Sequence, residues 1–417
     1  DQLVAGAHSR GIKVILDLVL NHTSDQHPWF IESRSSIDNP KRDWYLWRTN
    51  PQSEDLPPNN WLSWFGGKAW EYDERTGEYY YHMFYKEQPD LNWRNSLVRK
   101  EMMDVFRFWA DKGVDGFRLD VFNEYFKDAQ FRNNPSRIGH RGFDRQSHPY
   151  DTNQPEIMEV VKEIRSVLDG YSEKYAVGEP FLSSVDQAAG YCGPEKLHAT
   201  FDFTLLGTRW HPAHYLEAIL QWDKLIHPDA WPCYTLNNHD NIRSATRFKC
   251  GEKDEQLKVA AALLLTLRGT PFMYYGEEIG MRNLEVSIRE MQDRVGRTYW
   301  PVPVGRDGCR SPMQWNASES SGFTTGSPWI KIHPNHVTRN VERQQSDPRS
   351  LLNFYRKLLK VRKTHPALQR GMFIPLIHNP QRVLAYLRQN ETESILVALN
   401  FVRRPSKLAL GGELTRR

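Results

Sequence analysis

Three acidic residues follow short apolar segments, where they could take part in one reaction. Asp120 ends the segment GFRLD, Glu179 ends AVGE and Asp240 ends LNNHD. Two carboxylates on either side of a glycosidic bond can cleave it, because one attacks or stabilises the anomeric carbon while the other protonates the leaving oxygen. The sequence therefore predicts this chemistry if the fold brings the ends of these segments together.

The neighbours of the acids suggest different roles for them. Arg118 and Asp120 are two residues apart, so their side chains lie on the same face of a strand. The pair is either a structural clamp or the floor of an active site, and a nearby cation favours the ionised carboxylate that a nucleophile needs. Glu179 has apolar neighbours and no adjacent cation in the sequence, which favours the protonated form that a general acid needs. His22 and His239 could donate hydrogen bonds to substrate hydroxyl groups, although each residue alone could equally be structural.

The order of the apolar segments predicts the elements that position these residues. Strand-like runs occupy 14–22, 114–121, 175–181, 199–206, 232–240 and 270–278, and helix-like segments precede several of them, at 1–11, 96–112, 155–174 and 256–269. Helices and strands in alternation are typical of parallel βαβ units. Polar residues at the carboxyl ends of successive strands favour a (β/α) barrel, because the active sites of such barrels lie at that edge.

Two segments interrupt this alternation and predict additional domains. Residues 24–95 are rich in Trp, Pro and Gly and predict an inserted domain, while the three strand-like pieces within 366–417 predict an antiparallel β domain that could be incomplete. The catalytic barrel would then comprise 1–23 and 96–365. Since a closed barrel needs eight strands and six are visible, we expect the first two strands to be missing from this chain.

Composition argues against several functional classes. The net charge of +4 comes from 55 basic and 51 acidic residues without a long basic run, so nothing indicates a nucleic-acid partner. The apolar runs are shorter than the roughly 18 residues of a membrane span. The four cysteines lack metal-ligand spacing, which favours a reducing, cytoplasmic location and indicates no metal site. The aromatic residues within 61–85 suit either platforms for sugar rings or bases, or small cores packed by the loops themselves.

The polar segments resemble, in order, the motifs of the α-amylase superfamily of glycoside hydrolases. These segments are DLVLNH (17–22), GFRLDV (116–121), VGEP (177–180) and NNHD (237–240). QPDLN (88–92) and GRDGCRSPMQW (305–315) further resemble its oligo-1,6-glucosidase and α-glucosidase branch. The resemblance implies a (β/α)8 TIM barrel, an inserted B domain after the third strand and a C-terminal antiparallel β domain, with the first visible strand being the third.

The resemblance also implies roles for individual residues. Asp120 matches the nucleophile, Glu179 the general acid/base and Asp240 the carboxylate that stabilises the transition state by binding sugar hydroxyls. The residues expected to line the subsite of the cleaved glucose are His22, Arg118, His239, Phe84 and Arg310. Asp17 and Asn21 are expected to support them from behind, with Asp17 holding Arg118. The reaction would be a double displacement with retention of configuration, through a glucosyl intermediate on the nucleophile.

The expected substrate is a short α-glucoside from which an exo-acting α-glucosidase releases the non-reducing glucose. Val121 follows the expected nucleophile and resembles α-1,6-acting members, whereas α-1,4-acting relatives more often carry Ala or Thr there. Trehalose synthase, sucrose isomerase and trehalose-6-phosphate hydrolase activities remain open, as does a non-catalytic relative that binds a partner. No cofactor or metal is expected for the chemistry, and the family allows a structural calcium only in the missing N-terminal region. The oligomeric state is left open.

Overall fold

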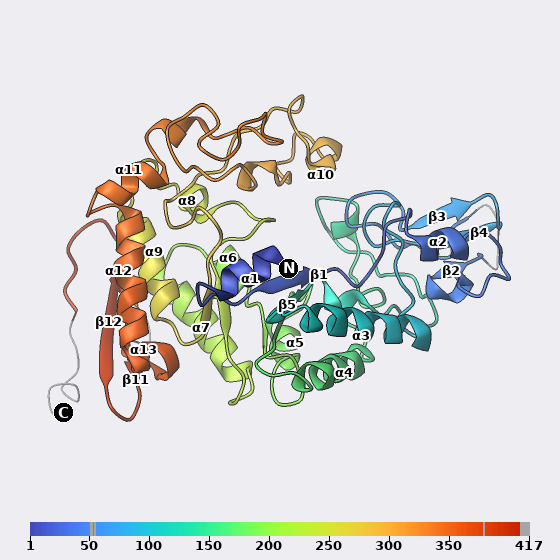
Figure 1. Cartoon of the computed structure of the whole chain (residues 1–417), viewed down its shortest axis with the longest axis horizontal. Helices are drawn as coiled ribbons and strands as arrows, with labels where there is room; N and C mark the ends of the chain where they lie inside the picture. The colour runs from blue at the N-terminus through green and yellow to red at the C-terminus, as the bar shows by residue number, and fades with distance from the viewer. Residues whose placement is uncertain (51–52, 54–55, 378–379, 409–417) are drawn as a thin grey trace. The chain divides into compact units, whose positions relative to one another are not determined.

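The chain, seen here as a computed structural model, is described for residues 1–50, 53, 56–377 and 380–408 (Figure 1). It forms two compact units. The first unit comprises Asp1–Phe201 and Ile226–Trp231, and the second comprises Asp202–Leu225 and the chain from Pro232 onward. Each unit is described by itself.

The first unit is built on a four-stranded parallel sheet. Its strands, in spatial order, are β1 (Ile15–Leu18), β5 (Gly116–Leu119), β6 (Tyr175–Gly178) and β7 (Ala199–Thr200). The helices that precede them are α1 (Gln2–His8), α3 (Ser96–Asp111), α4 (Ile157–Asp169) and α5 (Val185–Gly190). The predicted alternation of helices and parallel strands is therefore confirmed in this unit.

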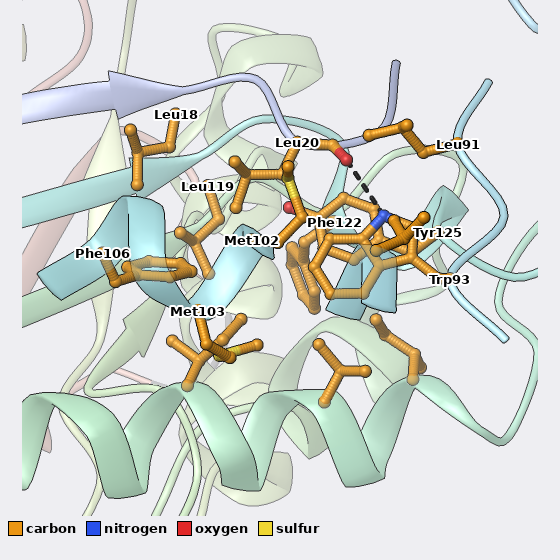
Figure 2. Packing of buried hydrophobic residues seen from close by; sticks show 14 of the residues in the cluster. Leu18, Leu20, Leu91, Trp93, Met102, Met103, Phe106, Leu119, Phe122 and Tyr125 are labelled. Carbon is orange, nitrogen blue, oxygen red and sulfur yellow. Dashed lines mark hydrogen bonds between the residues drawn. The ribbon is translucent and has the colours of Figure 1, made fainter. Parts of the chain in front are cut away.

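Helix α3 shows why these segments fold as they do. Asn95 caps it by accepting a hydrogen bond from the Leu97 backbone N–H, and its apolar residues recur every three to four positions, which gives one buried face. Figure 2 shows Met102, Met103 and Phe106 of this face packed beside residues of β1 and β5. In the same core, the Trp93 indole donates a hydrogen bond to the Leu20 carbonyl at 2.9 Å (Figure 2). The chain that follows β1 is thereby fixed to the core.

The segment between β1 and α3 forms a small structure of its own. It contains α2 (Pro28–Ser33) and an antiparallel sheet with the order β2 (Trp47–Arg48), β4 (Glu78–Tyr81) and β3 (Trp70–Asp73). Trp61, Trp70 and Tyr81 are almost fully buried and pack against one another. These aromatic residues thus make a local core, which is the second of the two alternatives that the sequence left open for 61–85.

The second unit contains two parallel strands and a separate antiparallel sheet. The parallel pair is β8 (Cys233–Thr235) with β9 (Thr270–Phe272), and the antiparallel sheet has the order β10 (Met372–Pro375), β11 (Val383–Gln389) and β12 (Ser394–Asn400). Its helices are α6 (Thr204–Gly207), α7 (Pro212–Leu225), α8 (Ser244–Arg247), α9 (Glu255–Thr266), α10 (Arg294–Thr298), α11 (Val341–Ser346), α12 (Leu351–Thr364) and α13 (Pro366–Arg370). The expected C-terminal antiparallel sheet is confirmed, while the expected domain boundaries stay a prediction.

The predicted strands are all shorter in the structure, and the segment 199–206 departs most from the prediction. Only Ala199–Thr200 of the segment 199–206 pairs as a strand, and a short helix begins at Thr204. The Asp202 side chain accepts hydrogen bonds from the Thr204 backbone N–H at 2.8 Å and from its hydroxyl at 2.6 Å. Asp and Asn commonly turn the chain into a helix in this way, so the apolar pattern alone overextends the strand.

Among the described residues, no helix is long and apolar enough to cross a membrane.

Candidate active site

Asp120 and Glu179 directly follow two neighbouring strands of the first unit. The Asp120 backbone N–H donates to the Leu18 carbonyl at 3.1 Å, and that of Glu179 donates to the Leu119 carbonyl at 2.9 Å, so both residues continue the parallel ladder. Phe117 and Leu119 of β5 are fully buried on one face, as the sequence alternation predicts. Arg118 lies on the opposite face with the two acids.

Arg118 joins the acids into one charged group. Its Nη1 donates to Asp17 Oδ1 at 2.7 Å and to Asp120 Oδ1 at 2.5 Å, while its Nη2 donates to Glu179 Oε2. Burial opposes the positive charge, but the three carboxylates around it raise the pKa of Arg118, so the guanidinium stays charged. The contact with Asp17 is the one that its expected supporting role requires.

The sequence neighbours of Glu179 include no cation, but in the structure the Arg118 guanidinium contacts its carboxyl group. Strands β5 and β6 pair in parallel with Arg118 opposite Val177, which brings the guanidinium within contact of the acid two residues further along β6. Sequence neighbours do not reveal such a cross-strand partner, since register depends on how the strands pair. The general acid role of Glu179 stays a prediction, but it no longer rests on a cation-free surrounding.

His22 lies after the end of β1, next to an aromatic ring and an amide. Its ring centroid is 5.4 Å from that of Phe84, and its Nε2 is 2.9 Å from the Gln88 side-chain nitrogen. Burial lowers the pKa of His22, which favours the neutral imidazole as a hydrogen-bond partner. Sequence reasoning missed Gln88, although it opens the motif QPDLN and that motif was the available signal.

A buried ion pair supports this side of the site. Asn21 donates from Nδ2 to Asp90 Oδ2 at 2.8 Å, and the Lys127 ammonium lies 3.2 Å from the same oxygen. Lys127 also donates to the Glu124 carbonyl, and its ammonium lies 3.9 Å from the Glu124 carboxylate. Burial raises the pKa of Glu124 well above its usual value. Sequence reasoning missed the pairing of Lys127 with Asp90, for which the local sequence VFNEYFK gives no clear signal.

Val121 and Phe84 are both largely buried in one apolar cluster of the first unit. Val121 has φ +36° and ψ +40°, a left-handed conformation that branched side chains rarely adopt. It turns the chain from β5 into the short 3-10 helix Phe122–Glu124, directly after Asp120. Strained backbone of this kind is found where the surrounding structure fixes it, often at functional sites.

His239, Asp240 and Arg310 come together in the second unit, after the end of β8. Arg310 donates from Nη2 to Asp240 Oδ1 at 2.6 Å and from Nε to the His239 carbonyl at 2.8 Å. Arg306 contacts the same Asp240 oxygen at 3.3 Å. Sequence reasoning missed Arg306, even though it belongs to the quoted motif GRDGCRSPMQW. Two guanidinium groups therefore hold and orient this carboxylate.

Chemically, the first unit offers two carboxylates bound by one arginine, and the second offers a carboxylate held by two arginines. Among the residues that the structure describes, no group of three or more His, Cys, Asp or Glu could hold a metal ion. That no cofactor is needed stays a prediction. Retaining glycoside cleavage requires an attacking carboxylate and a proton donor, and the first unit supplies a candidate for each.

Residues 1–371 match the family model described as the alpha amylase catalytic domain. A probable alpha-glucosidase from Rhizobium meliloti (strain 1021) is 40% identical over 416 residues, which cover 96% of this chain and 75% of that protein. An oligo-1,6-glucosidase from Heyndrickxia coagulans is 38% identical over 438 residues, which cover 96% of this chain and 78% of that protein.

Solved structures are also similar to this chain over most of its length. The alpha-glucosyl transfer enzyme XgtA superimposes with a TM-score of 0.94 at 38% identity, covering 98% of this chain and 78% of that one. The trehalulose synthase MutB from Pseudomonas mesoacidophila MX-45 has a TM-score of 0.86 at 32% identity, covering 96% of this chain and 77% of that one.

Proposed function

Because this chain belongs to the α-amylase catalytic-domain family of glycoside hydrolases, we propose that it acts as a retaining, exo-acting α-glucosidase of the oligo-1,6-glucosidase group. Family membership confirms the resemblance found in the motifs and the expected TIM-barrel class with its C-terminal antiparallel sheet. The observation that carries the mechanism is Arg118, whose guanidinium contacts both Asp120 and Glu179.

In the first step, an oxygen of Asp120 attacks the anomeric carbon of the terminal glucose. The bond from that carbon to the leaving oxygen breaks, and the leaving oxygen takes its electron pair together with a proton from Glu179. Arg118 donates a hydrogen bond to Asp120 and thereby orients its carboxyl group for the attack. The product of this step is a glucosyl ester on Asp120, and the shortened saccharide leaves.

In the second step, Glu179 takes a proton from water while the water oxygen attacks the anomeric carbon, which releases Asp120 and glucose with its original configuration. The Arg118 guanidinium contacts the Glu179 carboxyl group and orients it for this step. The resemblance to the family assigns to Asp240 the binding of sugar hydroxyls in the transition state, and within the second unit Arg306 and Arg310 hold this carboxylate.

The substrates are short α-glucosides, with α-1,6 linkage slightly favoured over α-1,4. Val121 after the nucleophile and several relatives named oligo-1,6-glucosidase support this preference. Glucosyl transfer or sucrose isomerisation is the second candidate, supported by the structural similarity to proteins named alpha-glucosyl transfer enzyme and trehalulose synthase. Both reactions pass through the same glucosyl enzyme and differ in the acceptor that takes the glucose.

We also propose a cytoplasmic location. All four cysteines are buried and free, which suits a reducing compartment.

Glucose release from isomaltose, maltose, trehalose and sucrose tests the function, with all products identified. We expect isomaltose to be cleaved fastest, and Asp120→Asn to lower the rate by several powers of ten. Near wild-type activity of Asp120→Asn would contradict the mechanism, and faster cleavage of maltose would contradict the linkage preference. Disaccharide isomers as the main product from sucrose would favour the second candidate.

The role of Glu179 has its own test. Glu179→Gln should lower kcat/KM, which reports the first step, far more for isomaltose than for p-nitrophenyl α-glucoside, because nitrophenolate leaves without a proton. Equal losses of kcat/KM on both substrates would argue against a general acid at this position. Asp17→Asn is a useful comparison, since Asp17 contacts Arg118 but has no expected role in proton transfer.

A further inference from the structure

A buried asparagine closes the loop that carries His239 and Asp240. The Asn237 side-chain oxygen accepts the Ser244 backbone N–H, and its nitrogen lies 3.1 Å from the Ser244 hydroxyl. The Thr235 hydroxyl donates to the Asn237 carbonyl at 2.6 Å. The Asn237 side chain therefore ties the start of the loop to its end at Ser244, and Thr235 holds the Asn237 backbone, in the part of the chain between β8 and α8.

Glu277 holds this asparagine from behind. Its Oε2 accepts a hydrogen bond from Asn237 Nδ2, and its Oε1 accepts the Tyr355 hydroxyl of α12 at 2.9 Å. The Tyr274 backbone N–H approaches Oε2 at 3.5 Å. Glu277, Asn237 and Tyr355 are 7%, 4% and 3% exposed, so these bonds are made away from water, where an unmatched group is costly. Glu277 receives hydrogen bonds here from an amide, a hydroxyl and a backbone N–H, a set that an acceptor-only carboxylate satisfies.

The path from Glu277 to Asp240 is short and continuous. Asn237 is followed by Asn238, whose side-chain oxygen accepts the Asp240 backbone N–H at 3.0 Å and the Asn241 amide at 2.8 Å. A shift of Asn237 therefore moves the turn that presents Asp240. Arg310 holds only the outer side of this turn, through the Asp240 carboxylate and the His239 carbonyl.

We propose that Glu277 is a positioning residue for Asp240, which acts by fixing Asn237 and with it the whole turn 237–244. The proposal rests on the proposed glycosidase function, in which Asp240 binds the sugar in the transition state. A displacement of about 1 Å in such a group can lower the rate by about a hundred-fold, so the loss should fall mainly on kcat. Tyr355 contributes by orienting the Glu277 carboxylate.

Exchanging donor and acceptor in the hydrogen bond between Asn237 and Glu277 tests the positioning role without removing either side chain. Asn237→Asp places a second carboxylate against Glu277, and the two can only coexist by sharing a proton. Burial and the nearby Glu278 raise the pKa of Glu277, while Asn237, Tyr355 and the Tyr274 backbone oppose that rise. We expect Asn237→Asp to lower kcat roughly ten- to a hundred-fold, and increasingly so as the pH rises and the shared proton is lost.

Adding Glu277→Gln to Asn237→Asp restores the bond with donor and acceptor exchanged. The double variant should recover kcat to within a few-fold of wild type and lose the added pH dependence. Glu278→Gln is the matched control, because Glu278 is the next residue, also has a pKa raised by burial, and is bonded instead by the backbone of Gly276 and Glu278. Adding Glu278→Gln to Asn237→Asp should restore nothing.

Several results would overturn the proposal. Wild-type kcat in folded Asn237→Asp across the pH range would do so, as would a folded double variant that is no more active than the single one. If Asn237→Asp does not fold, Tyr355→Phe decides, with backbone hydrogen exchange of 237–244 as the readout. Faster exchange there supports the proposal, and unchanged exchange refutes it. A wild-type protein without glycosidase activity would instead contradict the proposed function, and the exchange measurement would still decide the positioning.

Discussion

Replacing Lys127 with methionine removes a buried positive charge and leaves a side chain of similar length. The ammonium is 1% exposed and lies 3.2 Å from Asp90, which is equally buried. Breaking a buried ion pair by removing one partner costs about 3–5 kcal/mol, because the other charge is left without compensation. Two features reduce this cost. Asp90 still accepts hydrogen bonds from Asn21 and from the Met83 backbone N–H, and burial already favours the protonated, neutral form of Glu124.

We therefore expect Lys127→Met to lower the free energy of unfolding by about 3 kcal/mol, measured from the midpoint and slope of urea unfolding. Lys100→Met is the control, since its ammonium pairs with Asp104 at the surface and its loss should leave the stability nearly unchanged. Adding Asp90→Asn to Lys127→Met removes the unpaired charge and should recover part of the loss. A loss below about 1 kcal/mol in Lys127→Met would refute the view that this pair anchors Asn21 and His22.

Further predictions concern charge, pH and thiol chemistry. Arg118→Lys should lower kcat on isomaltose by about a hundred-fold, because a compact ammonium cannot contact Asp17, Asp120 and Glu179 together; a loss under tenfold would argue against the shared guanidinium. Burial raises the pKa of Asp202 to about 6, whereas the unfolded value is about 3.9. The group therefore favours folding below its unfolded pKa and loses that contribution as the pH rises through 6. Asp202→Asn should thus stabilise the protein at pH 7.5 by up to roughly 3 kcal/mol in urea unfolding, and the gain should shrink towards pH 5; a constant difference would contradict it. Burial raises the pKa of Cys309 to about 11, so an aromatic disulfide reagent should label none of the four buried thiols at pH 8 until guanidinium unfolds the protein, and rapid labelling of the native state would contradict this.

Local sequence patterns predict the elements of this fold well, because each parallel strand is a short apolar run that polar residues follow. The strands that end beside Asp120 and Glu179 lie where the apolar segments place them, and α3 begins at its asparagine cap. The strand predicted over 199–206 is too long for a local reason as well, because Asp202 turns the chain into a helix. An apolar pattern alone does not distinguish a continued strand from a turn into a helix.

Contacts between residues far apart in sequence could not be predicted in the same way. The ion pair of Arg118 with Glu179 depends on the register of two strands, and Lys127 pairs with Asp90, which is 37 positions earlier in the sequence. Sequence reasoning placed Glu179 in an apolar surrounding because its neighbours along the chain are apolar. The supporting residues of a site are therefore the part that needs the structure.

The two units share one way of supporting a histidine. Asn21 stands directly before His22 and is held by the buried Asp90, while Asn237 stands two residues before His239 and is held by the buried Glu277. Both partners are acids, and a carboxylate oxygen can accept the hydrogen bond that the asparagine amide donates. The groups around the two buried acids differ. Asp90 is paired with the Lys127 ammonium, whereas Glu277 accepts hydrogen bonds from a hydroxyl and an amide. Loss of Lys127 should therefore appear mainly as lost stability. Exchange of donor and acceptor between Asn237 and Glu277 should instead be tolerated, because it changes no net charge and leaves the same hydrogen bond in place.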